Sequence, residues 1–171
     1  ELYEAFNGDS VLPVIDFRET TNVVVLQSLS KTAGLAGLRI GFAFGNNHVI
    51  NCISRVTGPY DINTFAVTAA KAALEDQKYI DSYVSEVFQA RDWLKNQLNK
   101  KKIKYHLNAG NYLLIWPKLQ PKKMEQYLRD EGILIRDMSS KPLIEGAFRV
   151  SIGSKNQMLK FWNAFVKYEL I

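Results

Sequence analysis

Cysteine and histidine are scarce in this chain of 171 residues, which has one cysteine, Cys52, and two histidines, His48 and His106. A single thiol excludes any disulfide within the chain, and this scarcity is typical of a reducing compartment, so a cytoplasmic location is expected. Cys52 lies in the apolar run 49–53, which predicts a buried packing role. Two isolated histidines without cysteine or carboxylate at ligand spacing do not make a metal site, so we expect both to be structural or on the surface.

Long apolar runs are also missing, and none approaches the length of a membrane span. The sequence shows neither a Walker-type glycine loop nor a Ser-His-Asp arrangement. Basic residues exceed acidic ones by 22 to 17, and much of the excess lies in residues 95–104 around Lys100, Lys101 and Lys102. No nucleic-acid-binding motif accompanies this run. We therefore expect a solvated helix end, where cations suit the helix dipole, with no nucleic-acid, membrane or metal partner.

Apolar periodicity predicts an α/β fold. The first part contains strands at 23–27 and 40–45, a turn between them, and a short helix at 48–56. After Asn63, apolar residues recur at spacings of three and four, which predicts two helices, the second ending near the lysine cluster.

The period then changes to two. The expected elements are strands at 103–107 and 112–116, a helix at 124–131 that begins near Pro121, strands at 133–136 and 148–152, and a closing helix at 156–168. This order indicates part of a large domain (1–63), connecting helices (64–102) and a small α/β domain (103–171).

The segment 28–42, SLSKTAGLAGLRIGF, follows the apolar run 23–26, which we expect to be a buried strand. Lys31 has hydroxyls three and one residues before it, on Ser28 and Ser30, and Arg39 lies eight residues after it. A lysine in a loop is usually a surface charge. An amine beside hydroxyls and a guanidinium also suits a phosphorylated aldehyde, because the amine can condense with the carbonyl while the other groups hold the phosphate. These residues point to pyridoxal phosphate as a cofactor.

Two glycines in this segment, Gly34 and Gly37, would let the backbone turn tightly or approach a ligand, although an irregular loop would contain them too. Two arginines, Arg136 and Arg149, lie on or beside short apolar strands and need an anionic partner there. From the residues alone, a salt bridge to Asp16, Asp137 or Glu145 is favoured over a bound anion. Both alternatives stay open at this point.

The lysine segment resembles that of the class I and II aminotransferases, the fold-type-I pyridoxal phosphate enzymes, and is most similar to their histidinol-phosphate branch. Residues 1–6, ELYEAF, resemble the family's Asp-Glu-Ala-Tyr-x-Glu-Phe strand end without its first aspartate. Residues 59–63, PYDIN, resemble its Pro-Tyr-Asn-x-Asn stretch. Residues 132–137 and 148–154 resemble its paired arginine segments near the C-terminus.

The resemblance implies a role for each matching residue. Lys31 would bind the cofactor's aldehyde covalently and move the proton at the substrate's Cα. Phosphate binding would fall to Ser28, Ser30 and Arg39, while Tyr3 would hydrogen-bond the cofactor's phenolic oxygen.

The two arginines would bind the substrate. Arg149 would hold the substrate's α-carboxylate in a bidentate fork, and Arg136 would meet the substrate's phosphate end.

The activity implied is transamination in histidine biosynthesis, in which histidinol phosphate and 2-oxoglutarate give imidazole-acetol phosphate and glutamate. The substrates would be small amino acids and 2-oxo acids, and the complete enzyme would be a cytoplasmic homodimer. Alternatives are a lyase of the same fold, such as a threonine-phosphate decarboxylase, an aromatic amino acid transaminase, or a non-catalytic truncated fragment.

The resemblance also implies that the chain is the C-terminal half of such an enzyme, with residues 1–63 forming part of its cofactor-binding large domain. The aspartate that would pair with the cofactor's ring nitrogen is expected immediately before Glu1, and the rest of the cofactor site in a preceding half. We therefore expect the isolated chain to be inactive, to bind pyridoxal phosphate weakly, and to expose apolar surface where the rest of the large domain would lie.

Overall fold

A computed structural model describes residues 1–6 and 8–169 of the chain. The contacts divide it into two units, Glu1–Val84 and Ser85–Ile171, which are described separately below. The division falls within the expected connecting segment 64–102. The assignment of three domains with boundaries at 63 and 102 stays a prediction.

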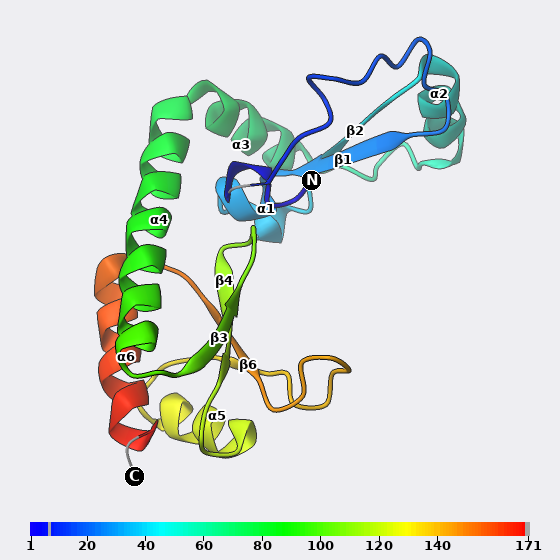
Figure 1. Cartoon of the computed structure of the whole chain (residues 1–171). Helices are drawn as coiled ribbons and strands as arrows, with labels where there is room; N and C mark the ends of the chain where they lie inside the picture. The colour runs from blue at the N-terminus through cyan, green and yellow to red at the C-terminus, as the bar shows by residue number, and fades with distance from the viewer. Residues whose placement is uncertain (7, 170–171) are drawn as a thin grey trace. The chain divides into compact units, whose positions relative to one another are not determined.

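Unit 1, Glu1–Val84, is built around an antiparallel ribbon of β1 (Val24–Ser28) and β2 (Gly41–Gly45), in which Val24 pairs with Gly45 and Ser28 with Gly41 (Figure 1). Both strands were expected from the sequence and are confirmed. The connection between them folds into α1 (Leu29–Thr32) and a 3-10 helix (Ala36–Leu38), where the sequence predicted only a turn. Another 3-10 helix (Glu4–Phe6) lies near the start of the chain.

The helices of unit 1 begin at asparagine caps. Asn46 accepts the N–H of His48 at the start of α2 (Asn47–Val56), and Asn63 accepts the N–H of Ala66 at the start of α3 (Thr64–Glu75). The caps fix where each helix starts, and both expected helices are confirmed. A small cluster of buried side chains joins the lysine segment to α3, and its members are Leu29, Ile40, Ala66 and Ala70.

Two expectations of burial in unit 1 are wrong. The run 23–26 was expected to be a buried strand, yet Val25 alone of its residues is buried and Leu26 is 58% exposed. A two-stranded ribbon has no further strands beside it, and apolar composition does not reveal what covers a strand. Cys52 is exposed on α2, where its Sγ lies 3.8 Å from His48 Nε2. The apolar run 49–53 lies on a surface helix and is not part of a core.

Unit 2, Ser85–Ile171, contains a four-stranded antiparallel sheet in the order β3-β4-β6-β5. Its strands are β3 (Lys104–Leu107), β4 (Tyr112–Trp116), β6 (Phe148–Ser151) and β5 (Arg136–Asp137). The helices are the end of α4 (Gln77–Lys100), then α5 (Pro121–Asp130) and α6 (Lys155–Glu169). All but one of these elements agree with the expected order, and each unit mixes helix with sheet as the α/β prediction requires.

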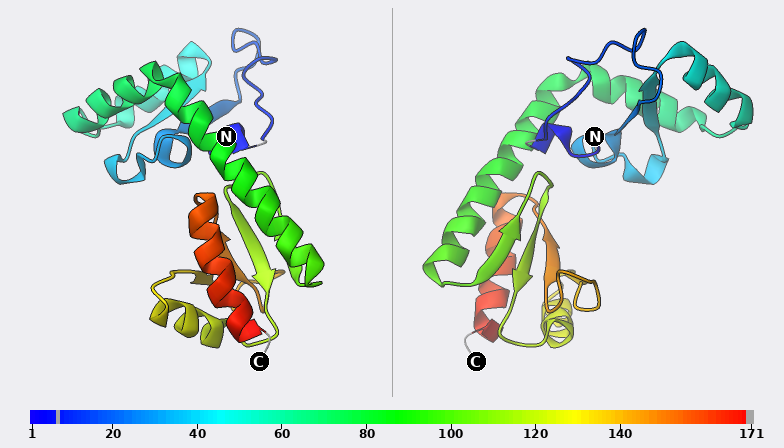
Figure 2. Two further views of the ribbon diagram at one scale, coloured as in Figure 1. Left: turned by 90° about the vertical axis from the view of Figure 1, so that its left-hand side faces the viewer. Right: turned by 45° about the vertical axis from the view of Figure 1, so that its right-hand side comes forward.

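Aromatic side chains form the core of unit 2. Phe148 on β6 is fully buried, and its ring lies 6.3 Å from that of Phe161 and 5.7 Å from that of Phe165, both on α6. Figure 2 shows α6 beside the sheet. The part of α4 in this unit buries Val87, Ala90, Leu94 and Leu98, at the spacings of three and four that predicted the helix.

The expected strand at 133–136 is wrong. Only Arg136 and Asp137 pair with β6, and Leu134 is 74% exposed. The N–H of Ile133 is bonded instead to the carbonyl of Leu128, which closes the end of α5. Three aliphatic residues in a row predict a strand, but the end of the preceding helix holds Ile133, and the strand begins only at Arg136.

Among residues 1–6 and 8–169, no helix combines the length and the apolar composition that a bilayer crossing needs.

Candidate functional site

The lysine segment takes its shape from its serines. Ser28 caps α1, because its Oγ accepts the N–H of Ser30 at 3.1 Å. The two serine Oγ atoms lie 2.7 Å apart, and Ser28 Oγ is also 3.3 Å from the carbonyl oxygen of Ile40. Lys31 follows directly in the same short helix and is half-buried. The structure thus brings the two predicted hydroxyls together, one residue before the predicted lysine.

Arg39 has a backbone conformation that the sequence did not predict. Its φ of 56° and ψ of 44° lie in the left-handed region, which costs a residue other than glycine about 1–2 kcal/mol. Its Nη1 donates to the carbonyl of Ala36 at 2.9 Å, and its side chain is exposed. Such strain gathers at functional sites. Because Arg39 ends the 3-10 helix just before β2, its conformation sets the direction in which the chain re-enters the ribbon.

One of the two glycines expected to matter here has a conformational reason to be glycine. Gly34 has a φ of +70°, which favours a residue without a Cβ, and it turns the chain immediately after α1. Gly37 has no positive φ, and a Cβ there would meet nothing within 4 Å. Gly34 therefore shapes the lysine segment, while the structure gives no steric reason for glycine at position 37.

Tyr3 lies just before the first 3-10 helix, is half-buried, and accepts the N–H of Phe6 through its carbonyl. The neighbouring Glu1 carries a larger hydrogen-bond network that sequence reasoning missed. Its carboxylate accepts from Val11 N–H at 2.8 Å, Ser10 Oγ at 2.9 Å and Gln27 Nε2 at 3.0 Å. The hydrogen bond from Val11, followed by that from Gln27, lowers the pKa of Glu1. This carboxylate ties the start of the chain to β1.

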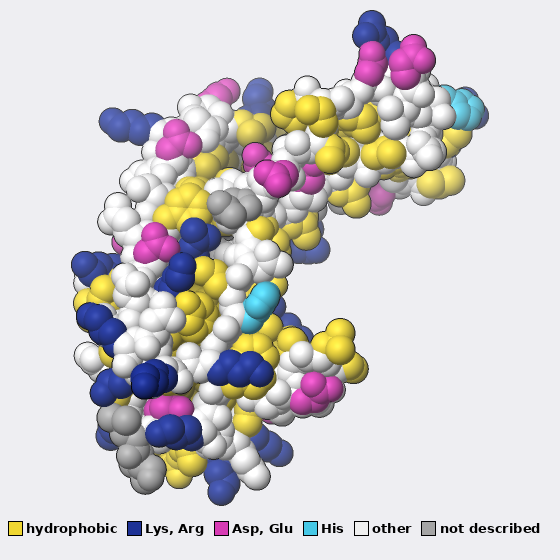
Figure 3. Space-filling model, viewed as in Figure 1, with side chains coloured by type: hydrophobic (Ala, Val, Ile, Leu, Met, Phe, Trp, Pro, Cys, Tyr) yellow, Lys and Arg dark blue, Asp and Glu magenta, His cyan; other side chains and the backbone are white. Residues whose placement is uncertain are grey.

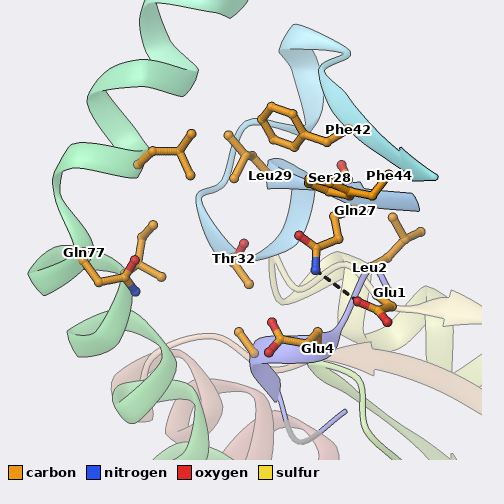
Figure 4. A pocket seen from close by; sticks show the side chains of 13 residues that line it. Glu1, Leu2, Glu4, Gln27, Ser28, Leu29, Thr32, Phe42, Phe44 and Gln77 are labelled. Carbon is orange, nitrogen blue, oxygen red and sulfur yellow. Dashed lines mark hydrogen bonds between the residues drawn. The ribbon is translucent and has the colours of Figure 1, made fainter. Parts of the chain in front are cut away.

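An apolar cavity of about 500 Å³ lies beside these residues in unit 1 (Figure 4). Leu2, Leu29, Phe42 and Phe44 line it, together with Ser28, and Figure 4 marks the bond between Gln27 and Glu1 at its edge. Tyr3, Ser30, Lys31 and Arg39 are not among its lining residues. The cavity thus has a mostly apolar wall that the ribbon and the neighbouring helices form, and Ser28 and Thr32 are the polar residues of the lysine segment that reach it.

In unit 2, the predicted substrate arginines are cross-strand partners. Arg136 on β5 pairs directly with Arg149 on β6, so both side chains lie on one face of the sheet. Phe148, which packs against α6, belongs to the opposite face. Arg136 is exposed and Arg149 is half-buried. Like charges directly opposite each other destabilise a sheet unless an anion compensates them.

The salt-bridge alternative for these arginines is wrong. Among the described residues, no ion pair joins either arginine to an acid. Asp16 is bound to Arg18, Asp137 accepts the N–H of Ser139, and Glu145 accepts the N–H of Leu143. The carboxylates proposed as partners thus have other donors, and no acid among the described residues compensates the charge of the paired arginines.

The surroundings of this pair are basic and aromatic. The Arg149 guanidinium lies 5.4 Å from the centroid of the Tyr112 ring, and Lys104 Nζ lies 4.5 Å from that of Trp116. In the view of Figure 3, Lys and Arg side chains are spread over unit 2 with few acidic ones between them. This face therefore suits an anion that also presents a flat or apolar part.

Both histidines are exposed, in agreement with the surface alternative in their prediction. Within the part of the chain that the structure describes, no group of three or more histidine, cysteine, aspartate or glutamate side chains could hold a metal ion.

Known proteins are similar to this chain over almost all of its length. A histidinol-phosphate aminotransferase of Geotalea uraniireducens is 35% identical over 165 residues, which are 96% of this chain and 47% of that protein. The solved L-threonine-O-3-phosphate decarboxylase of Porphyromonas gingivalis superposes with a TM-score of 0.84 at 24% identity, over 98% of this chain and 53% of that one. The histidinol-phosphate aminotransferase of Sinorhizobium meliloti, solved in complex with pyridoxal-5'-phosphate, gives a TM-score of 0.77 at 22% identity, over 87% of this chain and 41% of that one.

These likenesses extend over almost the whole chain, although it spans only about half the length of the curated relatives it matches. The α/β fold expected from the sequence is confirmed by the solved neighbours. Residues 1–165 match the family described as aminotransferase class I and II, and the chain belongs to that family.

Proposed function

We propose that this chain supplies the lysine-bearing half of a pyridoxal phosphate-dependent aminotransferase that acts on histidinol phosphate and 2-oxoglutarate. The observation that carries the proposal is the lysine segment, in which Lys31 directly follows two serine hydroxyls 2.7 Å apart. The arginines without acidic partners on β5 and β6 support an anionic substrate. The reaction would belong to histidine biosynthesis, and a cytoplasmic homodimer stays a prediction.

The residues of the lysine segment fit the cofactor. Lys31 offers a primary amine for the aldehyde, and Ser28, Ser30 and Arg39 offer two hydroxyls and a guanidinium for the phosphate. Ser28 Oγ keeps acceptor capacity while it caps α1, and Ser30 Oγ lies within hydrogen-bond distance of it. In our proposal, the left-handed backbone of Arg39 directs its guanidinium to the phosphate.

When bound, pyridoxal phosphate supplies a ring that stabilises negative charge at the substrate's Cα. Lys31 takes the Cα proton and returns it, as general base and then general acid. The Tyr3 hydroxyl would donate to the phenolic oxygen of the cofactor and stabilise negative charge there. These roles are assigned by resemblance. They require an amine at position 31 and a hydroxyl at position 3, and this chain has Lys31 and Tyr3 there.

The arginine pair fits the anionic groups of the two proposed substrates, because histidinol phosphate has a phosphate and 2-oxoglutarate has carboxylates. Arg149 is half-buried and can bind a carboxylate with its planar fork. Arg136 is exposed beside it, where a phosphate would offset the repulsion between the two guanidinium groups.

A second candidate is a decarboxylase acting on threonine phosphate. The arginine pair is the observation that favours it, because that substrate has a carboxylate and a phosphate in one molecule, whereas histidinol phosphate has only the phosphate, and the solved decarboxylase shares the fold. The two candidates differ in which bond at Cα breaks, so assays distinguish them. Glutamate release from 2-oxoglutarate indicates transamination, and carbon dioxide release indicates the lyase.

The test uses the protein expressed from its complete reading frame. The protein is saturated with pyridoxal phosphate and reduced with borohydride, and its peptides are analysed by mass spectrometry. We expect a pyridoxyl adduct on Lys31 that is absent in Lys31→Arg and present in the matched control Lys71→Arg, whose changed residue is an exposed lysine of α3. An unmodified Lys31 under these conditions would contradict the proposal.

A further inference from the structure

A tyrosine on the strand next to Arg149 shares its face of the sheet. Tyr112 on β4 pairs with Ser151, two residues beyond Arg149 on β6, so Tyr112 and Arg149 are diagonal neighbours on one face. The guanidinium carbon of Arg149 lies 5.4 Å from the centroid of the Tyr112 ring, which is within range for a cation–π interaction. The ring therefore offers its electron-rich face to the side chain that we propose binds the substrate's carboxylate.

The position of the Tyr112 ring is fixed in turn by Gly110. A Cβ at Gly110 would lie 2.5 Å from Cε1 and 2.8 Å from Cδ1 of the ring, closer than real Cβ atoms approach. Gly110 is buried and has no positive φ, so its backbone does not require glycine. Space for the aromatic ring is therefore the physical reason for glycine at this position.

Arg149 needs such a support because of its other neighbour. Arg136 lies directly opposite on β5, and no acid among the described residues pairs with either arginine. An arginine in that setting would swing away from the like charge and lose the fixed direction of its fork. A ring that attracts the guanidinium on one side keeps it on the face of the sheet before the ligand arrives.

We propose that Tyr112, seated on Gly110, is a positioning residue that holds the Arg149 guanidinium in the orientation in which it binds a carboxylate. The role of that carboxylate as substrate rests on the proposed function above. Tyr112 acts through its ring, so phenylalanine should replace it and an aliphatic residue should not. Moving the ring by changing Gly110 should have the same effect as removing it.

The experiment follows the side-chain Nε–Hε resonance of Arg149 by nuclear magnetic resonance, assigned by its loss in Arg149→Lys. The chain is titrated with L-glutamate as the carboxylate probe and, separately, with inorganic phosphate. In Tyr112→Leu and Gly110→Ala we expect the resonance to lose the shift caused by the ring, and glutamate binding to weaken about twofold to fivefold. Tyr112→Phe should match the wild type in both respects. Tyr105→Leu, a tyrosine change on the opposite face of the same sheet, is the matched control.

The proposal is overturned if Tyr112→Leu and Gly110→Ala keep both the wild-type resonance and the wild-type affinity for glutamate. Far-UV circular dichroism checks that each variant folds, and if one fails, the other decides. The borohydride adduct on Lys31 tests the proposed function separately. If it forms in every variant while glutamate binds equally, only the role of Tyr112 is lost. If it never forms in the protein expressed from the complete reading frame, the aminotransferase proposal is lost whatever the resonance shows.

Discussion

The two units of the chain are nearly equal in length and bury very different amounts of apolar surface. Among the described residues, 7 hydrophobic side chains are buried in Glu1–Val84 and 19 in Ser85–Ile171. The exposed large hydrophobic side chains are distributed in the opposite way, with 13 in the first unit and 3 in the second. The lysine segment thus lies on a ribbon with little core beneath it, and the arginine pair on a sheet with a full one.

Charge differs between the units as well. Unit 1 has 6 basic and 9 acidic residues, a net charge of −3, while unit 2 has 16 basic and 8 acidic residues, a net charge of +8. The chain's overall charge of +5 therefore describes neither unit. Positive charge is concentrated in the unit that carries Arg136 and Arg149, which suits the recognition of anionic substrates.

The lysine segment and the arginine pair therefore differ in how much core supports each of them within its own unit. Unit 2 can hold its arginines with its own sheet and helices. Unit 1 has fewer buried apolar side chains and leaves an apolar cavity open beside its ribbon. We therefore expect unit 2 to be the more stable unit in this chain.

The largest effect is expected when an aromatic ring is removed from the core of unit 2, because this should take away the greater stability of that unit. Phe148 is fully buried and contacts two rings of α6. Phe148→Ala should therefore destabilise unit 2 by about 3–5 kcal/mol. Urea unfolding followed by tryptophan fluorescence measures this, because Trp93, Trp116 and Trp162 all lie in unit 2.

The matched control for this change is Leu134→Ala, also in unit 2. Leu134 is 74% exposed, so its truncation should change the free energy of unfolding by no more than about 0.5 kcal/mol. Equal effects of the two substitutions would show that the aromatic core does not stabilise unit 2.

A smaller effect is expected at the cap of α3 in unit 1. Asn63 Oδ1 accepts the N–H of Ala66 at 2.8 Å and its Nδ2 donates to the carbonyl of Leu38 at 3.3 Å. Asn63→Ala should destabilise α3 by about 1 kcal/mol, seen as faster hydrogen exchange of its amides. Asn63→Asp keeps the cap and loses only the donor to Leu38, so it should leave α3 protected. If Asn63→Ala leaves exchange in α3 unchanged, the helix does not depend on its cap.

The next prediction concerns pH and Glu169 at the end of α6. Burial raises the pKa of this carboxyl, partly offset by the hydrogen bond from the Lys118 N–H, so the folded state keeps the proton to a higher pH than the unfolded state does. The stability that this group contributes is complete below its ordinary pKa of 4.5 and is lost as the pH rises through the raised pKa. Glu169→Gln keeps an acceptor for Lys118 and should reduce this fall in stability.

Denaturant midpoints measured between acidic and neutral pH test the sign. Glu131→Gln is the comparison of opposite sign, because Lys167 lowers the pKa of Glu131 and stabilises the folded state above the unfolded pKa. Glu131→Gln should therefore lose less stability than the wild type does as the pH falls through the pKa of Glu131. A pH profile that is the same in Glu169→Gln and the wild type would contradict the role of Glu169.

The smallest expected effect is that of the ion pair between α6 and the end of α5. Lys167 Nζ lies 2.7 Å from Glu131 Oε1, and both side chains are exposed to solvent. Because water and salt screen such pairs, Lys167→Gln should shift the denaturant midpoint only slightly, and the shift should vanish at high salt. A large shift that survives high salt would show that the pair acts as more than a surface contact.

Sequence reasoning succeeded where the signal was local. The strand predicted at 112–116 is β4, the helical pattern predicted after Asn63 begins at α3, and the spacing of Val87, Leu94 and Leu98 predicted the buried side of α4. It failed where the answer depended on what lies beside a segment. The aliphatic run 133–135 is held by the end of α5, and Leu26 lies on a ribbon that no further strand covers.

The candidate site divides in the same way. Residue types and spacing were enough to single out Lys31, Ser28, Ser30 and Arg39, but did not predict the left-handed backbone of Arg39. Spacing also singled out Arg136 and Arg149, and left open whether acids or a ligand compensate them. That question was decided by strand register, which places the arginines opposite each other and away from the acids that could have paired with them.

The amino-acid sequence by itself determined which groups are present and where most of the helices and strands form, because hydroxyls, amines, caps and periodicity act between residues close along the chain. Tertiary structure alone decided that two like charges face each other, that a tyrosine ring seated on a glycine lies against one of them, and which apolar residues stay uncovered. The physical reason is that burial, register and charge compensation depend on groups far apart in the sequence.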